Sequence, residues 1–177
     1  MSDPATAPTR AAIRWLSLGP AARLVGVDPA PFLERAARTG AEVDTALWDE
    51  GRAVYADADV RTGQLVPARS AAGLSPLLAG IPSAERAARM VVRLADSRVS
   101  VDGGFVVTSQ SEHDAGFQPT RYWRGPVWPI LNWVLQRGLE RYGYAREAAE
   151  VRRGMLELVE RGGFWEHYSP RTGRGHG

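Results

Sequence analysis

The sequence of 177 residues contains no cysteine and no long apolar run. Without cysteine the chain can form no disulfide bond, thiolate metal site or thiol nucleophile, which is more typical of a reducing compartment than of a secreted protein. A membrane-spanning helix needs roughly 18 or more consecutive apolar residues. Residues 1–10 also lack the apolar core of a signal peptide. These absences predict a cytoplasmic protein.

Lysine is absent as well, so all 22 basic residues are arginines, and with 20 acidic residues they give a net charge of +2. The isoelectric point of about 9.4 therefore reflects the arginine guanidinium, which does not titrate, rather than a strong positive field. The arginines often adjoin acids, as in Glu34/Arg35 and Glu160/Arg161, and they form no basic run. We therefore do not expect the chain to bind nucleic acid.

Apolar residues recur at helical spacing along most of the chain, in pairs of segments joined by short loops. The spacing and the capping residues predict about six helices, at 11–25, 28–50, 71–80, 83–94, 125–143 and 145–161. Asp57, Asp59 and Thr62-Gly63 indicate a turn inside a short β-hairpin or an extended loop. Residues 1–10 are expected to be disordered, and 105–124 to form a loop. The fold class predicted is all-α, built of helix hairpins.

One aromatic segment lies where the helical pattern fails. Residues 121–128, followed by Asn132 and Trp133, combine indole and phenol rings with two arginines at a predicted loop-to-helix junction. Flat aromatic faces stack on the C–H face of a sugar ring, and Arg, Asn and Tyr side chains bind its hydroxyl groups. The same residues fit an interior of buried aromatic anchors equally well.

A second aromatic segment, residues 163–170, contains Glu166 among Phe164, Trp165, His167 and Tyr168. A carboxylate framed by aromatic rings can have its pKa tuned and can hold a water molecule against a sugar, as hydrolytic carboxylates do. The alternative is a surface glutamate next to core aromatics. Taken alone, this segment favours that alternative.

Other kinds of site fit the sequence poorly. The run Glu-His-Asp at 112–114 could join His167 or His176 at a metal ion, but three adjacent residues on a regular element do not all face one ion. Ser109 and Ser111 lie outside the Gly-x-Ser-x-Gly turn that exposes a serine nucleophile. Glycine-rich phosphate and dinucleotide motifs are absent. We therefore predict neither a metal nor a cofactor.

Several motifs together resemble one known family. They are Tyr-Trp-Arg-Gly-Pro-Val-Trp-Pro at 122–129 with Asn132-Trp133, and Phe164-x-Glu166-x-Tyr168-x-Pro170-x-Thr172-Gly173-x-Gly175. Earlier segments, Leu-Trp-Asp-Glu at 47–50 and Ala-Gly-Leu-x-Pro-Leu at 72–78, occur in the same order as in that family. The chain thus resembles the mannosylglycerate hydrolase-like members of the clan that includes processing α-glucosidases. The resemblance extends from about Leu47 to the end of the sequence.

The resemblance implies an (α/α)6 barrel of inner and outer helices and a metal-free, inverting glycosidase acting on a small α-linked sugar such as mannosylglycerate or glucosylglycerate. Glu166 matches the family's general base. Six residues match positions that bind the substrate or shape its pocket: Tyr122, Trp123, Arg124, Gly125, Trp128 and Tyr168. The expected partner is a small carbohydrate, and neither nucleic acid nor a membrane is implied.

The length departs from the family, because twelve helices with their loops need roughly twice this many residues. Residues 1–177 are therefore expected to form a single incomplete domain, the C-terminal half of the barrel. The general acid is expected in the preceding half. Glu112 and Asp114, in the loop before Tyr122, are weak substitutes for it. An incomplete ring leaves an apolar edge, which predicts self-association or pairing with the missing half.

Three other interpretations remain open at this stage. The chain could be a catalytically inactive remnant that binds carbohydrate, or a fragment of an α-glucosidase, trehalase-like or debranching-type enzyme. Alternatively, it could be a helical interaction module in which the aromatic residues are only core.

Overall fold

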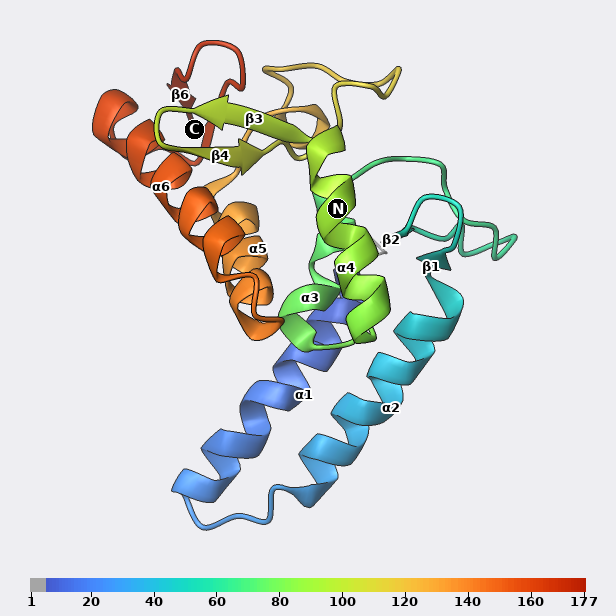
Figure 1. Ribbon diagram of the computed structural model, residues 1–177. Coiled ribbons are helices and arrows are strands. Elements are labelled where there is room, and N and C mark those ends of the chain that lie inside the picture. Colours follow the sequence, from blue (N-terminus) through green and yellow to red (C-terminus); the bar gives the residue numbers. More distant parts are fainter. Residues whose placement is uncertain (1–5) are drawn as a thin grey trace.

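The computed structural model describes the backbone of residues 6–177 and the side chains of residues 13–95 and 97–177. Helices dominate this part of the chain (Figure 1): α1 Thr6–Leu24, α2 Ala30–Ala46, α3 Pro76–Ala79, α4 Ala84–Arg93, α5 Pro129–Arg141 and α6 Ala145–Gly162, with the 3-10 turns η1 Ala71–Leu74, η2 Leu94–Asp96 and η3 Tyr122–Arg124. Three antiparallel hairpins accompany them: β1 Trp48–Asp49 with β2 Val54–Tyr55, β3 Arg98–Val101 with β4 Gly104–Val107, and β5 His167–Tyr168 with β6 Gly175–His176. The predicted count of six helices is confirmed, but the fold contains more hairpins than the one expected.

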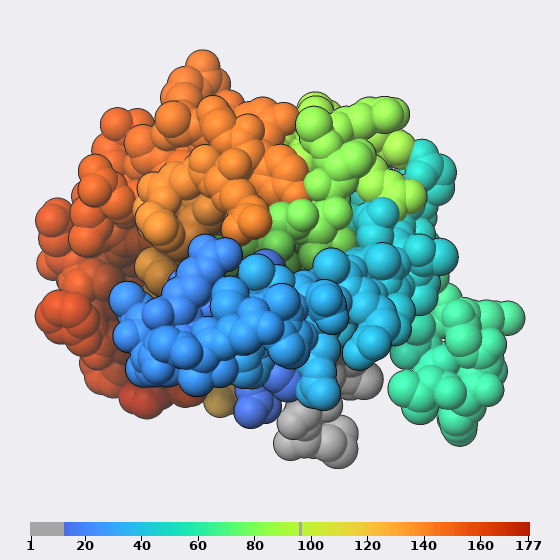
Figure 2. Space-filling view, turned by 90° about the horizontal axis from the view of Figure 1, so that it is seen from below, coloured from blue at the N-terminus to red at the C-terminus, as the bar shows by residue number. Residues whose placement is uncertain are grey.

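Helices α1 and α2 form an antiparallel pair that projects from the rest of the molecule (Figure 1). Figure 2 looks onto the free end of this pair. The two helices approach closely at Gly19, where an added Cβ would lie 2.7 Å from a methyl carbon of Leu33. Helix α1 continues through Pro20, because losing one backbone hydrogen bond does not end a packed helix. It begins at Thr6, within the segment expected to be disordered, and residues 1–5 lie outside the described residues.

Helix α2 ends at Ala46, earlier than the predicted end at residue 50. The reason is a tight turn, in which the Asp49 side chain accepts a hydrogen bond from the Arg52 backbone N–H at 2.9 Å and closes the β1–β2 hairpin. The predicted turn after residue 57 is confirmed by an antiparallel bridge between Ala58 and Leu65, and this segment projects at one side of the molecule (Figure 2).

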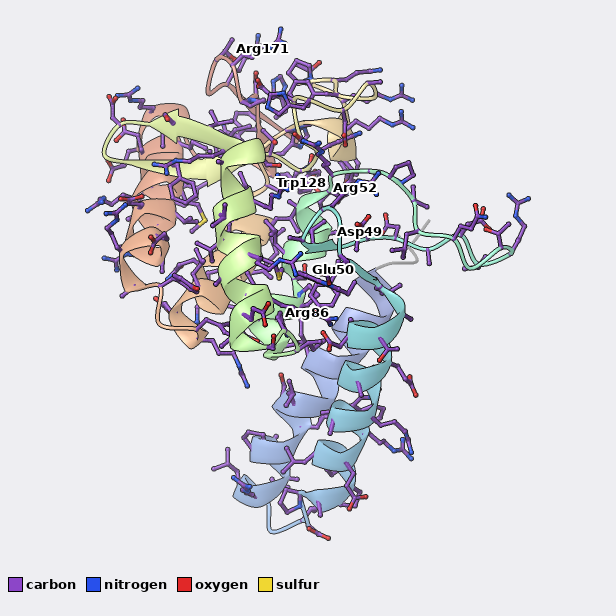
Figure 3. All side chains as sticks on the ribbon, turned by 45° about the vertical axis from the view of Figure 1, so that its right-hand side comes forward. Asp49, Glu50, Arg52, Arg86, Trp128 and Arg171 are labelled. Carbon is purple, nitrogen blue, oxygen red and sulfur yellow. The ribbon has the colours of Figure 1, made fainter. Side chains whose placement is uncertain are left out.

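Aromatic and charged side chains gather where α2 meets the rest of the molecule, and Figure 3 labels two of the charged ones, Glu50 and Arg86. We call them the Trp48 cluster: Asp44, Trp48, Glu50, Tyr55, Arg86 and Arg89. The guanidinium of Arg86 lies 4.7 Å from the centre of the Trp48 ring and forms an ion pair with Asp44 at 2.6 Å. The Trp48 indole N–H donates to the Glu50 carboxylate, and the Tyr55 hydroxyl donates to Asp44. The cluster joins α2, the β1–β2 hairpin and α4.

The main core lies between α3, α4, α5, α6 and β4. Leu77, Met90, Leu139 and Val151 are completely buried there. Helices α3 and α5 touch at Gly138, where a Cβ would lie only 2.6 Å from the Cβ of Leu77. The predicted apolar faces of α5 and α6 are confirmed, and α6 ends within one residue of the predicted position.

The β3–β4 hairpin corrects the expected loop that begins at residue 105. Asp102-Gly103 forms its turn, with Gly103 at φ +75°, a conformation that glycine adopts without a side-chain clash. Strand β4 lies directly on α6. A Cβ atom added at Gly104 of β4 would overlap the backbone of Glu150 in α6, and a Cβ atom added at Gly154 of α6 would overlap the backbone of Phe105 in β4. Apolar residues on both sides of an Asp-Gly pair are a recognised hairpin signal.

Helix α5 begins at Pro129 and not, as predicted, at Gly125-Pro126. The segment before it is extended because Val127 exchanges two backbone hydrogen bonds with Tyr168, at 2.8 and 2.9 Å. This bridge places the segment before α5 beside the β5–β6 hairpin. None of the helices described here is both long and apolar enough to cross a membrane.

Candidate active site

The Val127–Tyr168 bridge brings the two aromatic segments of the sequence together. The neighbours of Val127 are Trp128 and, through η3, Tyr122 and Trp123, while the neighbours of Tyr168 are Glu166 and His167. Residues far apart in the chain therefore lie in one surface cluster, as the family resemblance predicts for a sugar-binding site.

Four aromatic rings form a continuous stack, which we call the ring stack: Trp123, Trp128, His167 and His176. Trp123 and Trp128 lie 3.8 Å apart between ring centres and are almost parallel, at 6°. Trp128 and His167 follow at 5.0 Å, and His167 and His176 at 5.7 Å. Tyr122 meets Trp123, Trp128 and His167 edge-on, a favourable arrangement for aromatic rings.

The stack has one open end. Trp128 is 3% exposed and its indole N–H donates to the Tyr122 carbonyl at 3.1 Å, whereas Trp123 is 48% exposed. Trp128 therefore supports Trp123 from behind and leaves part of the Trp123 ring open to solvent. An exposed indole held rigidly in this way is suited to stacking against a sugar ring.

Glu166 lies at the edge of this cluster. Its carboxylate is exposed and accepts a hydrogen bond from the Tyr122 hydroxyl at 3.2 Å. Loss of solvent around the hydroxyl and then the Glu166 charge raise the pKa of Tyr122, so this phenol remains a hydrogen-bond donor at neutral pH. Glu166, the predicted base, therefore lies beside the predicted aromatic residues. It is hydrogen-bonded to Tyr122, whose ring meets the exposed Trp123 ring edge-on.

Tyr122 itself adopts an unusual backbone conformation, with φ at +26°. A bulky residue in this region costs on the order of 1–3 kcal/mol, and such residues persist mainly at functional sites. The turn is held by hydrogen bonds from Arg124 N–H to Arg121 C=O at 2.7 Å and from Gln118 N–H to Arg124 C=O at 2.6 Å. These bonds fix the direction in which the Tyr122 hydroxyl points.

Two other predicted residues have supporting positions. The Gly125 N–H donates to the buried Ser109 hydroxyl at 3.0 Å, and a Cβ at Gly125 would lie 2.5 Å from the Gln118 carbonyl oxygen. Tyr168 is completely buried, and its hydroxyl donates to the Gly163 carbonyl and accepts from the Trp165 N–H. Tyr168 is therefore not open to a ligand here, contrary to its predicted contact with substrate. It instead supports the turn that carries Glu166.

Arg124, Asn132 and Trp133 lie at different depths and take different roles. Arg124 is exposed, with its guanidinium beside Gly116. Asn132, for which the sequence left a sugar site and a core role equally open, is completely buried and bonds to both backbone groups of Val107, at 2.7 and 3.0 Å. Trp133 is half-exposed on α5 and takes no part in the ring stack.

The two acids in the preceding loop do not reach the cluster. Asp114 accepts hydrogen bonds from the Arg69 backbone N–H at 2.7 Å and from Gln110 at 3.4 Å, so it anchors its own loop. Glu112 is exposed and, in the described part of the chain, has no hydrogen bond or ion pair with Tyr122 or Glu166. The described side chains also include no group of three or more acids and histidines able to hold a metal ion.

His167 is the functional candidate that the sequence did not single out. It is 6% exposed, and its Nδ1 atom is buried without a hydrogen-bond partner among the described residues. Burial and the neighbouring His176 lower the pKa of His167, while the Glu166 carboxylate partly opposes this shift. The β5–β6 hairpin, whose register sets His167 directly opposite His176, is seen only in the structure, so the sequence carries no local signal for this pair.

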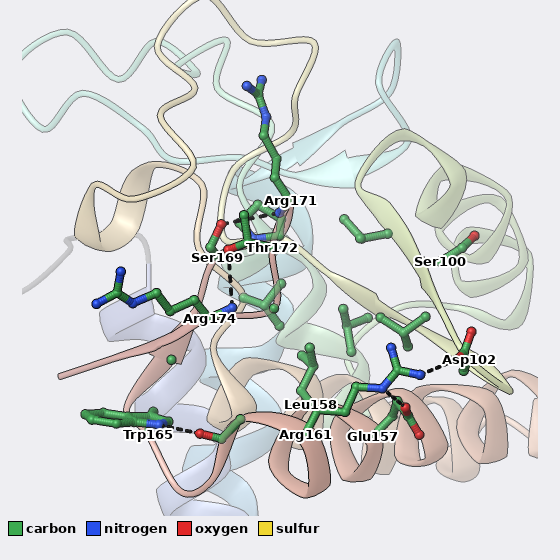
Figure 4. Close-up of a pocket in the computed structure, with 18 residues that line it drawn as sticks. Ser100, Asp102, Glu157, Leu158, Arg161, Trp165, Ser169, Arg171, Thr172 and Arg174 are labelled. Atoms are coloured by element: carbon green, nitrogen blue, oxygen red, sulfur yellow. Dashed lines mark hydrogen bonds and ion pairs between the residues drawn. The ribbon is translucent and has the colours of Figure 1, made fainter.

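A separate cleft of about 610 Å³ lies between β3, the end of α6 and the loop before β6 (Figure 4). Arg161 crosses it and pairs with Asp102 and Glu157, and the Trp165 indole N–H donates to the Gly162 carbonyl at 2.6 Å. Neither Glu166 nor the two stacked tryptophans line this cleft.

Comparison with known proteins decides the family. The model of the mannosylglycerate hydrolase MGH1-like glycoside hydrolase domain matches residues 11–177. The chain belongs to this family. A mannosylglycerate hydrolase from Rubrobacter radiotolerans is 37% identical over 158 residues, which make up 88% of this chain and 36% of the relative. Mannosylglycerate hydrolase MGH1 from Selaginella moellendorffii is 43% identical over 141 residues, 80% of this chain and 28% of that protein.

The fold agrees with this assignment. The crystal structure of a GH63 mannosylglycerate hydrolase from Thermus thermophilus in complex with glucose superposes with a TM-score of 0.82 at 34% identity. The match covers 92% of this chain and 41% of that structure. The chain therefore spans well under half the length of these relatives, all of which are named mannosylglycerate hydrolases.

Proposed function

We propose that this MGH1-like chain is the part of a glycoside hydrolase catalytic domain that carries the general base, Glu166. The observation that supports this role is the hydrogen bond from the Tyr122 hydroxyl to Glu166, formed beside the half-exposed Trp123 ring. The substrate proposed is a small α-linked sugar such as mannosylglycerate or glucosylglycerate, in keeping with the names of the relatives.

The chemistry requires two carboxyl groups. In an inverting glycosidase, one carboxylate takes a proton from a water molecule while that water forms a bond to the anomeric carbon. The bond to the departing oxygen breaks at the same time, and a carboxylic acid on the other side protonates that oxygen. The two carboxyl groups lie roughly 6.5–9.5 Å apart, which leaves room for the water.

Glu166 has the features of the base. It is exposed to solvent, so its carboxylate is open to a water molecule. The Tyr122 hydroxyl holds Oε1 and leaves Oε2 to accept the proton. The sugar ring would lie on the open face of Trp123, with Trp128 and Tyr122 fixing that face and Arg124 on the same turn.

We further propose that residues 1–177 form the C-terminal half of an (α/α)6 barrel and that the general acid comes from residues outside this chain. Glu112 is not in contact with the described cluster, and Asp114 is held by Arg69. Exposed apolar side chains give the chain surfaces for the other half or for a second copy. Among them Ile130 and Trp133 are about half exposed on α5, and Phe164 is 92% exposed.

The second candidate function is carbohydrate binding without turnover. This function is favoured by the positions of the two acids in the preceding loop. Asp114 is hydrogen-bonded to the Arg69 backbone, and Glu112 does not contact the cluster. Glu166 is then the one side-chain carboxylate in the described cluster. A site with only a base lacks the proton for the departing oxygen, and each missing proton transfer costs about 10²–10⁴-fold in rate.

Tryptophan fluorescence of the chain tests the binding step. Mannosylglycerate and glucosylglycerate should change the emission of the wild-type chain, and Trp123→Phe should remove that change. Trp133→Phe is the matched control, because Trp133 has a similar exposure but lies outside the ring stack. A response that depends on Trp133 and not on Trp123 would contradict the proposed site. Turnover of the same sugars then separates the hydrolase from the binding remnant.

A further inference from the structure

His167 is buried in an unusual way for a polar side chain next to a proposed catalytic group. It follows Glu166 in the chain, is 6% exposed, and keeps Nδ1 buried without a hydrogen-bond partner among the described residues. A buried polar atom normally finds a partner, and an exception calls for a functional or structural reason. The described neighbours of this ring are mainly other rings.

Three titratable side chains face His167 from the elements packed around it. His176 stacks on it from β6 at 5.7 Å, and Tyr122 meets it edge-on from η3 at 5.8 Å. Glu166 is the adjacent residue and interacts with it electrostatically. Trp128 covers the opposite face, and the Tyr168 hydroxyl is bound to Gly163 on the far side. The backbone of Gly177 lies against Glu166.

We propose that His167 is a positioning residue for Glu166: as a neutral ring it leaves the Tyr122–Glu166 pair intact, and when it takes up a proton it draws the Glu166 carboxylate away from Tyr122. The proposal rests on the function assigned to Glu166 above. His176 sets the pH of this switch, because two protonated imidazoles stacked face to face repel each other.

The physical argument follows from the two charge states. A neutral imidazole fits between Trp128 and His176 without a charge to solvate. A buried imidazolium needs an anion, and Glu166 precedes His167 in the chain and is hydrogen-bonded to Tyr122, whose ring meets His167 edge-on. That ion pair competes with the Tyr122 hydroxyl for the carboxylate and occupies the oxygen that would accept a proton from water. Proton uptake by His167 thus removes the base.

The direction of the pKa shift places the switch in mildly acid solution. Burial and His176 lower the pKa of His167 below the ordinary histidine value, so the ring is neutral at pH 7. The site is then in its active arrangement at neutral pH and loses it on acidification. Without His176, the same change would begin closer to neutral pH.

Proton NMR of the whole chain tests the coupling directly, since the sequence has only three histidines: His113, His167 and His176. His113→Gln and His176→Gln each remove one histidine signal and so assign that of His167. The His167 midpoint should lie below the ordinary histidine pKa of about 6.5. His176→Gln should move the His167 midpoint upward, and Glu166→Gln should move it downward. A His167 midpoint at the ordinary histidine value that neither variant moves would overturn the proposal.

The effect on the site is measured by sugar affinity as a function of pH. Displacement of Glu166 breaks its hydrogen bond with Tyr122, whose ring meets Trp123 edge-on, whereas Glu166→Gln keeps an oxygen that can accept that bond. Mannosylglycerate should therefore bind the wild-type chain on the order of tenfold more weakly at about pH 5 than at about pH 7.5. In His167→Phe, which keeps a ring in the stack, the ratio of the two affinities should fall to about one, while His113→Gln should keep the wild-type ratio. A pH step that persists in His167→Phe would refute the role of His167.

The two measurements separate this inference from the proposed function. If the wild-type chain binds no sugar at any pH but the His167 midpoint shifts as expected in the variants, the coupling between His167 and Glu166 is supported and the proposed function of Glu166 is contradicted. If sugar binds normally and the midpoints do not shift, the function stands and the role of His167 fails.

Discussion

The Trp48 cluster and the ring stack contain similar residues but are built in opposite ways. In the Trp48 cluster, the indole is 8% exposed, two guanidinium groups cover it, and its N–H donates to Glu50. In the ring stack, Trp123 is half-exposed, its neighbour is another ring, and the nearby Glu166 carboxylate has a single phenol donor among the described residues. One assembly neutralises its charges internally, and the other presents an open ring and an open carboxylate.

The comparison shows what distinguishes a structural aromatic cluster from a binding site. Both regions combine tryptophan, tyrosine, arginine and acid, in one segment at 47–55 and in the two segments 121–128 and 163–168. The difference lies in whether the acids are paired: Asp44 and Glu50 each have an arginine partner. Residue composition alone would identify both regions as possible binding sites. Whether each acid has an arginine partner distinguishes the structural cluster from the candidate site.

The largest expected effect is on turnover. In a full-length protein that carries this segment, Glu166→Gln should lower the rate of mannosylglycerate hydrolysis by about 10²–10⁴-fold or more, because the base is lost. Binding measured by fluorescence should survive. Glu50→Gln, which removes the acid of the Trp48 cluster, is the control and should leave the rate nearly unchanged. Equal losses of the hydrolysis rate in the two variants would show that the site and the Trp48 cluster do not differ in function.

The next effect is on stability. Trp48→Ala should lower the free energy of unfolding by about 3–5 kcal/mol, as expected for a buried tryptophan in a packed region. Trp123→Ala should cost only about 1 kcal/mol, since its ring stacks on one neighbour and is otherwise open. Urea denaturation of the two variants measures both values. Similar losses would show that Trp123 is a core residue.

A smaller effect is expected at the hydrogen bond between Tyr122 and Glu166. Tyr122→Phe keeps the edge-on ring contacts and removes only the hydroxyl, which should cost about 0.5–1.5 kcal/mol of transition-state stabilisation. The rate of hydrolysis should therefore fall a few-fold to about tenfold with little change in the unfolding curve. Tyr55→Phe, made in the Trp48 cluster, should instead change stability and leave the rate unaffected.

The smallest effects concern pH, and they have opposite signs in the two regions. Burial and His176 lower the pKa of His167, so the unfolded chain binds the proton more tightly. The contribution of His167 to stability is complete above its unfolded pKa and is lost as the pH falls below about 6.5. Burial and Asp44 raise the pKa of Tyr55, so its contribution is lost as the pH rises above about 10.

Thermal unfolding of the chain across this pH range checks both signs. His167→Phe should flatten the acid side of the stability profile, and Tyr55→Phe should flatten the alkaline side. An acid loss that is the same in wild type and His167→Phe would mean that other groups control it.

Much of the fold could be predicted because local signals and tertiary packing agree. Helix α6 has a continuous apolar stripe and a glycine end, and Ser83 caps α4 through the Arg86 N–H, as its sequence suggests. The β3–β4 hairpin has a local signal in Asp102-Gly103 that the expected loop overlooked, whereas the burial of β4 comes from α6, far along the chain. The early end of α2 depends on the turn around Asp49, which the apolar spacing does not reveal.

The candidate site could be predicted only in part for the same reason. Glu166, Tyr122 and Trp123 were identified from motifs, and the structure brings them together. The burial of Tyr168 and Asn132 follows from pairings with Val127 and Val107, which no local pattern indicates. Tyrosine and asparagine side chains suit a sugar pocket and a structural contact equally well. Only the pairing with residues far along the chain determines which of the two roles each one has.

The bridge between Val127 and Tyr168 has a consequence for how such a site can change. Its two bonds use only main-chain atoms, so the frame that joins η3 to the Glu166 turn does not depend on which side chains stand on it. Substitutions at positions 122–124 can therefore reshape the recognition surface while the frame is preserved. Slow amide hydrogen exchange at Val127 and Tyr168, unaltered by such substitutions, would be the mark of this independence.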